Sequence, residues 1–455
     1  MGNFHRLAGP AAMKRLPASA LPDGQRRPWW RALAWLSFLG PFFFASYGFA
    51  NWLSSQRGAV ATIVFDWERQ IPFIPWTIVP YWLMDLFYGL SLFLCANRRQ
   101  LDTHGKRLLL VQILAVSIFL LFPLRCTFVR GEVDGLYGWL FAALGRFDQP
   151  FNQAPSLHIA LLVILLEPYR IALPRRWHAL LWAAALLIAV SVLTTWQHQF
   201  FDLPTGLWLG CFVVWLLPSV GSSPLARARL TRDKRRQRLA ARYAVGALVC
   251  AALAIAYGGV CWWLLWPAGS LAVVGSIYLL FDASAFGKRA DGSLPQAVRV
   301  LLAPYLLAAW LNVRWWTRQL PTADPISADV LLGRLPNAGE LIRRRATALV
   351  DLCAELPGPA GEIQRTVVPM LDLLPPTDEQ LSQAVAAIEA LRRTGTVWVC
   401  CALGLSRSAL TVAAWLLHSG RASTVEQAIA LVRAARPAVV IDGAAIARLQ
   451  EWWRQ

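Results

Sequence analysis

The chain has 455 residues, of which 57% are hydrophobic and 15% charged, and it contains 23 tryptophans. This length fits two domains, and the long uncharged runs exclude an ordinary soluble protein because they can cross a hydrocarbon core of about 30 Å. The formal net charge is +18, but the basic residues form short clusters between apolar runs, as in the cytoplasmic loops of membrane proteins. We therefore expect a membrane protein with no nucleic-acid partner.

The N-terminal half is expected to be an all-α, multi-span membrane domain. A basic cytoplasmic tail (1–28) precedes a span-rich region (29–285) with about six to eight spans. The candidate spans are 30–53, 76–95, 107–124, 156–169, 179–195, 203–218, 243–266 and 268–282. Every second loop is basic, which places both termini in the cytoplasm. A six-span arrangement with an interfacial hairpin gives the same orientation.

A basic and aromatic linker (286–325) follows the last apolar run. Its segment 296–316 mixes arginine, tryptophan and leucine, and Arg299, Pro304 and Arg314 interrupt it. We interpret this segment as a helix that lies in the membrane interface. A ninth span would place the C-terminal region outside the cell.

The sequence pattern of residues 326–455 is typical of a small soluble α/β domain. Strand-like runs at 347–353 and 397–400 alternate with helical patterns at 378–392 and 424–433. Such alternation predicts a small α/β domain of about 130 residues, a normal domain size.

The strongest motif is the segment from Cys401 to Ser408, which lies between a predicted strand and a predicted helix. Backbone N–H groups of such a loop can wrap a phosphate, and the positive end of the helix favours the thiolate form of Cys401. Arg407 can bind two phosphoryl oxygens, and Ser408 can hydrogen-bond the sulfur as it leaves. The alternative is a buried cysteine with an unrelated arginine. The predicted phosphate-binding residues are Ala402, Leu403, Gly404, Leu405, Ser406 and Ser408.

This segment resembles the dual-specificity branch of the protein tyrosine phosphatases over residues 326–455. The resemblance implies a metal-free and cofactor-free phosphatase with a phosphocysteine intermediate, acting on a phosphoprotein or a soluble phosphate ester. It also implies a general acid upstream, for which Asp372 is the best match and Asp378 the second choice. The family has histidine before the nucleophile, whereas this chain has Cys400.

Cys353 is a further candidate, because its context is similar to the backdoor cysteine of the phosphatase-and-tensin family. That resemblance implies a reversible disulfide between Cys353 and Cys401 under mild oxidation. The alternative is an inert core cysteine.

A second set of chemical groups stands at the ends of membrane helices. His158 opens one candidate span in the sequence PSLH, and His198 and Asp202 are spaced by one helical turn between two others. Ionisable residues near a membrane boundary favour a functional role, and two histidines with an aspartate suit phosphoryl transfer through a phosphohistidine. Alternatively, these residues merely mark helix ends.

PSLH and the HxxxD spacing resemble the type 2 phosphatidic acid phosphatase superfamily, in its inositol phosphorylceramide and sphingomyelin synthase branch, over residues 60–220. The resemblance implies His198 as nucleophile, Asp202 as its partner and His158 as general acid. The superfamily's Lys-x6-Arg-Pro motif is absent, and Arg125 and Arg130 are the nearest cations for the phosphate.

The whole chain resembles bacterial fusions of these two domains. This resemblance implies a multi-pass inner-membrane phosphatase of phospholipid metabolism, with lipid phosphate as substrate of the histidine site. A lipid head-group phosphotransferase is the alternative enzyme, and a non-catalytic lipid-binding or regulatory role for one domain is the third interpretation. The loop pattern predicts that the histidine site faces outward and the cysteine site faces the cytosol.

Overall fold

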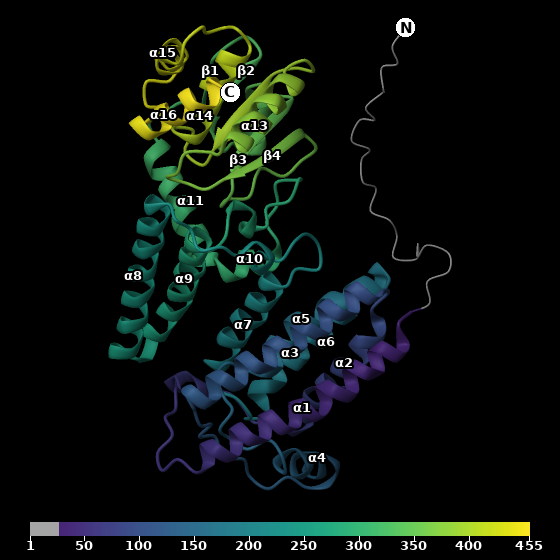
Figure 1. Cartoon of the computed structure of the whole chain (residues 1–455). Coiled ribbons are helices and arrows are strands. Elements are labelled where there is room, and N and C mark those ends of the chain that lie inside the picture. The colour runs from purple at the N-terminus through teal and green to yellow at the C-terminus, as the bar shows by residue number, and fades with distance from the viewer. Residues whose placement is uncertain (1–26) are drawn as a thin grey trace. The chain divides into compact units, whose positions relative to one another are not determined.

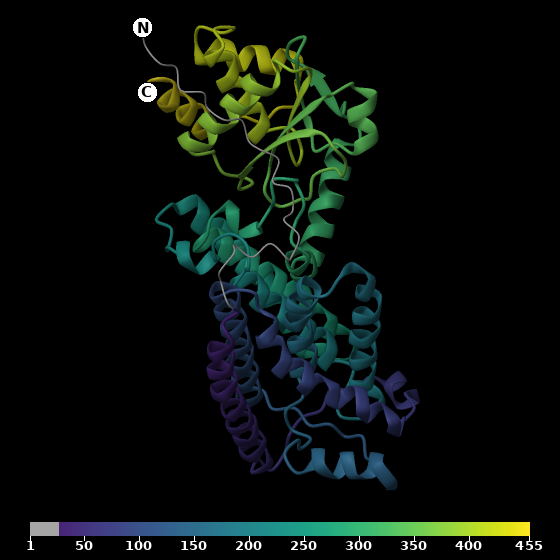
Figure 2. The same cartoon turned by 90° about the vertical axis from the view of Figure 1, so that its right-hand side faces the viewer.

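The computed structural model describes residues 27–455, so the predicted basic tail lies almost wholly outside the described residues. The chain divides into two compact units, Met1–Ser219 and Val220–Gln455, which are drawn in Figures 1 and 2. We describe each unit by itself.

The described part of the first unit is helical. Its helices are α1 (Trp29–Ser55), α2 (Ile78–Leu94), α3 (Arg98–Leu121), α4 (Gly135–Gly145), α5 (Leu157–Ala172), α6 (His178–Thr194) and α7 (Asp202–Leu216). α4 lies outside the eight spans predicted from the sequence. α5 and α7 are well packed: α7 places Gly206 and Gly210 one turn apart against α5. A Cβ at these glycines would fall 2.4 Å from the Ser156 carbonyl oxygen and 2.7 Å from that of Ala160. Small residues at this spacing let membrane helices approach closely.

Six helical segments in the described residues are long and apolar enough to cross a membrane. Four belong to the first unit (Trp29–Ser55, Pro75–Leu94, Arg98–Leu121 and Arg175–Thr194) and two to the second (Lys234–Tyr257 and Gly259–Leu279). Of the eight predicted spans, the two that correspond to α5 and α7 are shorter, with 16 and 15 residues. They measure about 24 and 22 Å at 1.5 Å per residue, which is less than a hydrocarbon core of about 30 Å.

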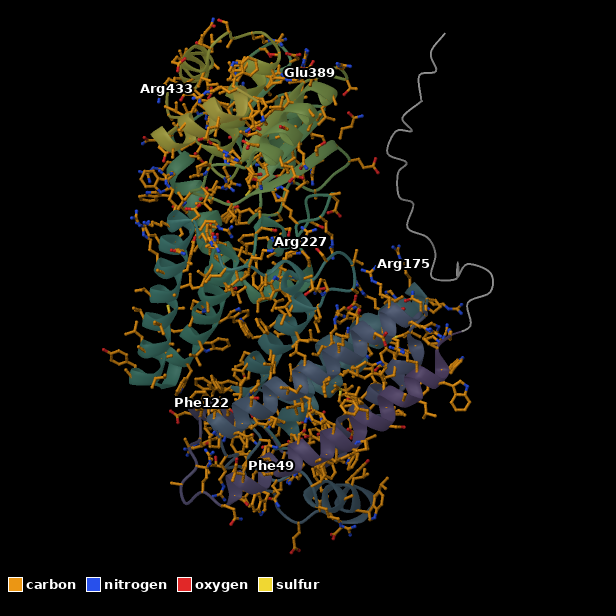
Figure 3. All side chains as sticks on the ribbon, viewed as in Figure 1. Phe49, Phe122, Arg175, Arg227, Glu389 and Arg433 are labelled. Atoms are coloured by element: carbon orange, nitrogen blue, oxygen red, sulfur yellow. The ribbon has the colours of Figure 1, made fainter. Side chains whose placement is uncertain are left out.

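The surface of the first unit is apolar along its helices and basic at one end. Figure 3 shows Arg175 at the opposite end of the helices from Phe122, whose side chain is 70% exposed. Near the basic end, Arg31 of α1 binds Asp102 of α3 at 2.6 Å. The orientation of these helices in a membrane stays a prediction.

The second unit begins with a helical hairpin. α8 (Lys234–Tyr257) packs along α9 (Leu265–Leu279), and Arg236 of α8 donates to the main-chain oxygens of Tyr278 and Phe281 at the end of α9. Cationic side chains commonly bind the free carbonyl groups at a helix C-terminus in this way.

Two helices replace the single interfacial helix that the sequence predicted at 296–316. α10 (Gln296–Leu301) ends at Leu302, and α11 (Ala303–Thr317) starts there with Pro304 in its first turn. α11 exposes Trp310, Trp315 and Trp316. Arginine side chains lie over two of the tryptophan rings, with Arg314 5.3 Å from the Trp310 centroid and Arg318 3.9 Å from that of Trp315.

A five-stranded sheet follows, in the order β1-β2-β5-β3-β4. The strands are β1 (Ala323–Pro325), β2 (Val330–Arg334), β3 (Ala348–Cys353), β4 (Gln364–Met370) and β5 (Val397–Cys401). All neighbours are parallel except β1 and β2. The α/β prediction is therefore confirmed, although the sheet starts at Ala323 and not at the predicted boundary of 326.

Helices cover both faces of this sheet. α13 (Asp378–Leu391), α14 (Arg407–His418), α15 (Val425–Ala435) and α16 (Gly443–Trp453) share a core with one face, which includes Cys401. On the other face, α12 (Ala338–Arg343) packs on Cys400, and α11 packs on Cys353 and Ala402. α11 thus lies directly behind the loop that follows β5.

Candidate active sites

The Cys401 loop connects the central strand β5 to α14. The Cys401 sulfur accepts a hydrogen bond from the Gly404 N–H at 3.3 Å and lies 3.3 Å from the Ser408 hydroxyl. Gly404 has φ +72°, and a Cβ there would fall 2.3 Å from the carbonyl carbon of Gly333. Glycine is therefore required for this turn. The strand, the loop and the helix N-terminus stand in the predicted order.

Arg407 is buried in the first turn of α14, and carboxylates surround it. Both of its terminal nitrogens bind Glu355, at 2.7 and 2.9 Å, and one also donates to the Met370 carbonyl oxygen. Its Nη2 lies 2.9 Å from the Asp372 carboxylate. Burial alone would raise the pKa of Glu355, but Arg407 lowers it more, so Glu355 stays ionised and holds the guanidinium in place.

Asp372 lies beside Arg407, as a general acid for this site should. Burial raises the pKa of its carboxyl, Arg407 opposes the rise, and Glu355 adds to it. A raised pKa keeps more of the acid form near neutral pH. The second choice, Asp378, lies in the first turn of α13 and binds Arg448 at 2.9 Å. Asp372, which lies against Arg407 and has a raised pKa, stays the first choice for the general acid.

A buried ion pair lies behind the loop, next to the cysteine that replaces the family's histidine. Asp351 of β3 is the register partner of Cys400 on β5. Lys288, from the linker after α9, lies 2.7 Å from the Asp351 carboxylate, and both side chains are fully buried. Lys288 also donates to the Cys353 carbonyl oxygen at 2.5 Å. Burial tends to lower the pKa of Lys288, but Asp351 raises it more, so the lysine stays protonated.

Cys353 is fully buried and packs against Ala402 and Leu403. Cys401 belongs to the core on the opposite face of the sheet. Burial raises the pKa of Cys353 well above its usual value, which favours the unreactive thiol. The disulfide between Cys353 and Cys401 stays a prediction, and this packing is the arrangement expected of the alternative core cysteine.

The two candidate histidines of the first unit, His158 and His198, meet where α5 and α7 begin. His198 Nδ1 lies 2.9 Å from the Asp202 carboxylate, and the rings of His158 and His198 are 6.1 Å apart. The Ser156 N–H donates to the Asp202 carbonyl oxygen at 2.9 Å, which ties PSLH to α7. The three predicted residues are therefore brought together, and Asp202 leaves the Nε2 atom of His198 free for chemistry.

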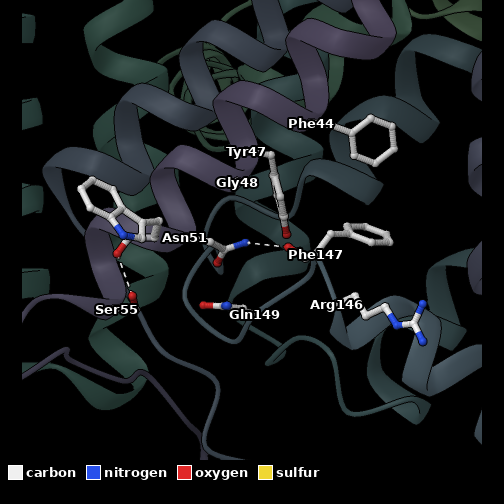
Figure 4. Close-up of a pocket in the computed structure, with 9 residues that line it drawn as sticks. Phe44, Tyr47, Gly48, Asn51, Ser55, Arg146, Phe147 and Gln149 are labelled. Carbon is white, nitrogen blue, oxygen red and sulfur yellow. Dashed lines mark hydrogen bonds between the residues drawn. The ribbon is translucent and has the colours of Figure 1, made fainter.

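A chain of polar contacts extends from His158 to a cavity beside α1. The Tyr81 ring packs on His158 with centroids 4.1 Å apart, and the hydroxyls of Tyr81 and Tyr47 both donate to Asp148. Tyr47 also lines the cavity, which measures about 240 Å³. Figure 4 shows its other lining residues, with Asn51 donating to the Phe147 carbonyl oxygen.

The cations proposed for the histidine site lie near aromatic rings. The Arg130 guanidinium is 4.9 Å from the centroid of Phe141 and within electrostatic reach of Tyr81 and Asp148. Arg125 is 6.0 Å from the centroid of Phe151. Of the two arginines, Arg130 interacts electrostatically with Tyr81 and Asp148, which connect to His158.

Comparison with known proteins defines the class of the C-terminal domain. Residues 345–455 match the family described as "Dual specificity phosphatase, catalytic domain". The protein is thus a phosphatase and hence a hydrolase, with the catalytic domain at its C-terminal end. The match does not extend to residues 1–344, so the resemblance of the membrane domain stays a prediction. A search of curated proteins finds no match to this chain.

Several solved structures are each similar to 30% of this chain. Tk-PTP in its active form is 28% identical, over 30% of this chain and 99% of its own, with a TM-score of 0.27. Human DUSP28 is 26% identical, over 30% of this chain and 94% of its own, with a TM-score of 0.27. PTPMT1 in complex with PI(5)P is 20% identical, over 30% of this chain and 96% of its own, with a TM-score of 0.26.

The structure adds residues that the sequence analysis did not select. Glu355 and Lys288 stand far from the motif in sequence, and Asp148 and its two tyrosines come from three separate segments. One feature of the sequence could have indicated Lys288. Asp351 is a charged residue in an otherwise apolar strand, and a buried charge requires a partner.

Proposed function

We propose that the C-terminal domain hydrolyses phosphate monoesters through a phosphocysteine at Cys401. The thiolate attacks phosphorus while the ester P–O bond breaks, and Asp372 gives its proton to the departing alkoxide. Water then attacks phosphorus while the P–S bond breaks, Asp372 takes the water proton, and inorganic phosphate and the thiolate are released. The carrying observation is the contact of the Cys401 sulfur with Gly404 N–H and Ser408 beside the buried Arg407.

Electrostatics support each of these roles. The loop N–H groups and the N-terminus of α14 favour negative charge, so they stabilise both the thiolate and the phosphoryl oxygens. Glu355 holds Arg407 by two hydrogen bonds, which fixes the planar guanidinium for a bidentate contact with phosphate.

The test uses the full-length protein in detergent with an aryl phosphate. Cys401→Ser should abolish this activity, and rapid quenching of wild type should place phosphate on the peptide that contains Cys401. Cys250→Ser, on α8, is the matched control and should retain activity. A chelator should leave the rate unchanged. A serine variant that still turns over, or a phosphorylated peptide without Cys401, would refute the mechanism.

For the membrane unit we propose hydrolysis of a lipid phosphate through a phosphohistidine. Asp202 binds Nδ1 of His198, so Nε2 can attack phosphorus, and His158 can protonate the leaving oxygen. The closeness of these three residues supports the proposal. Their location at the start of α5 and α7 is consistent with a substrate phosphate at the membrane surface, facing outward.

Two alternatives follow from the same geometry. If a lipid alcohol replaces water in the second step, the unit is a head-group phosphotransferase, and the cavity beside Tyr47 could hold that acceptor. Incubation with radiolabelled phosphatidate and diacylglycerol distinguishes the two, because transfer yields a labelled lipid and hydrolysis yields inorganic phosphate. A non-catalytic lipid-binding or regulatory membrane unit would yield neither product.

The linker completes the proposed organisation in a bacterial inner membrane. α11 exposes three tryptophans and carries arginines over their rings, a composition that suits the interface of an anionic membrane. We assign the cytosolic side to the cysteine site because a thiolate enzyme requires a reducing compartment.

A further inference from the structure

The loop that carries Asp372 is bound by a residue outside the phosphatase family match. Tyr278, in the last turn of α9, donates its hydroxyl hydrogen to the Asp372 carbonyl oxygen at 3.1 Å. Its side chain is 1% exposed. A helix that is long and apolar enough to cross a membrane thus contacts the residue proposed as general acid.

Tyr278 is itself held in place. Its ring stacks on that of Tyr243 of α8 with centroids 5.4 Å apart, and Tyr243 meets the ring of Tyr305 of α11 edge-on at 6.1 Å. Arg236 binds the Tyr278 main-chain oxygen at 3.0 Å. Three helices therefore fix the direction of the hydroxyl.

The acid loop requires such support because its own conformation is unfavourable. Leu373, the residue after Asp372, has φ +60°, a backbone conformation that residues other than glycine and asparagine rarely adopt because it is strained. The Leu373 side chain is 66% exposed, so it contributes little packing to hold this strained turn. The hydrogen bond from Tyr278 acts on the adjoining carbonyl group.

We propose that Tyr278 is a positioning residue for the phosphatase reaction: it fixes the acid loop so that the Asp372 carboxyl reaches the leaving oxygen. The proposal rests on the proposed role of Asp372. Under this proposal, protonation of the leaving group depends on the α8–α9 hairpin, whereas the attack of Cys401 on phosphorus does not.

This dependence has a kinetic signature. An alkyl phosphate leaves as a strongly basic alkoxide and needs the proton, whereas an activated aryl phosphate leaves as a weakly basic phenolate and does not. One hydrogen bond contributes about 0.5–1.5 kcal/mol. Its loss should slow an alkyl phosphate about three- to tenfold and a fluorinated aryl phosphate by less than about twofold.

The experiment uses the full-length protein in detergent with the histidine site silenced by His198→Ala. In this background, Tyr278→Phe removes the hydroxyl and keeps the ring stack. Tyr257→Phe is the matched control, because Tyr257 is 75% exposed at the other end of α8. kcat/KM is measured for both substrates. We expect a selective loss on the alkyl phosphate for Tyr278→Phe and no change for Tyr257→Phe.

Asp372→Asn separates this proposal from the proposed function. If Asp372→Asn lacks the selective loss on alkyl phosphate, the acid assignment is wrong. If Asp372→Asn shows it but Tyr278→Phe slows both substrates equally or neither, the positioning role is wrong. In the double variant Tyr278→Phe should add nothing to Asp372→Asn, since one acts through the other. An additive loss would also overturn the proposal.

Discussion

Removal of the Lys288 ammonium should destabilise the second unit strongly, although this residue lies outside the phosphatase family match. Lys288 and Asp351 are both fully buried and 2.7 Å apart. Replacement of Lys288 by methionine leaves the buried Asp351 carboxyl without its cationic partner. Breaking a buried pair in this way costs about 3–5 kcal/mol.

The magnitude can be checked by a double-mutant cycle. Lys288→Met and Asp351→Asn should each lower the melting temperature, by roughly 10 °C if each kilocalorie corresponds to about 2–4 °C in a unit of this size. The double variant should recover much of the loss, because no unpaired charge remains. Thermal unfolding in detergent, followed by residual aryl phosphatase activity, measures all four proteins. Additive losses, or a Lys288→Met protein as stable as wild type, would refute this reasoning.

Three further predictions concern pH, oxidation and topology. Glu355 raises the pKa of Asp372, so Glu355→Gln should lower the pKa of Asp372. The acid form of Asp372 is then lost at a lower pH, and the alkaline limb of the kcat profile moves to lower pH. An alkaline limb of the kcat profile that stays at the same pH or moves to higher pH would contradict this electrostatic assignment. Mild peroxide should form a reversible Cys353–Cys401 disulfide if Cys353 is a redox partner, and peptide mapping that finds none establishes the core-cysteine alternative. In intact cells, an impermeant thiol reagent should label Asp134→Cys, in an exposed loop of the first unit, and spare Cys401; the reverse result would invert the topology.

The cysteine loop was predictable in detail because its determinants are local. A strand, a glycine at positive φ and a helix N-terminus lie within a few residues of Cys401, so one short segment contains most of the site. Asp372 was selected from the sequence by its distance from the motif, and the structure brings it next to Arg407. Its role as general acid stays a prediction.

The supporting residues could not be predicted, because chain topology brings them together from distant segments. Glu355 precedes Arg407 by 52 positions, and Lys288 precedes Cys353 by 65. Similarly, the contact of Tyr278 with Asp372 joins a helix that is long and apolar enough to cross a membrane to the C-terminal phosphatase domain. The sequence predicted α5 and α7 as spans from their apolar character, although the predicted stretches, 156–169 and 203–218, were already about as short as the helices that the structure shows.

The central claim is that one chain carries two independent phosphatase sites. The direct measurement is the activity of purified His198→Ala and Cys401→Ser proteins against phosphatidate and against an aryl phosphate. His198→Ala should lose phosphate release from phosphatidate and keep aryl phosphate hydrolysis, and Cys401→Ser should show the opposite pattern. If both variants lose the same single activity and retain the other, the chain has one catalytic site and the account is wrong.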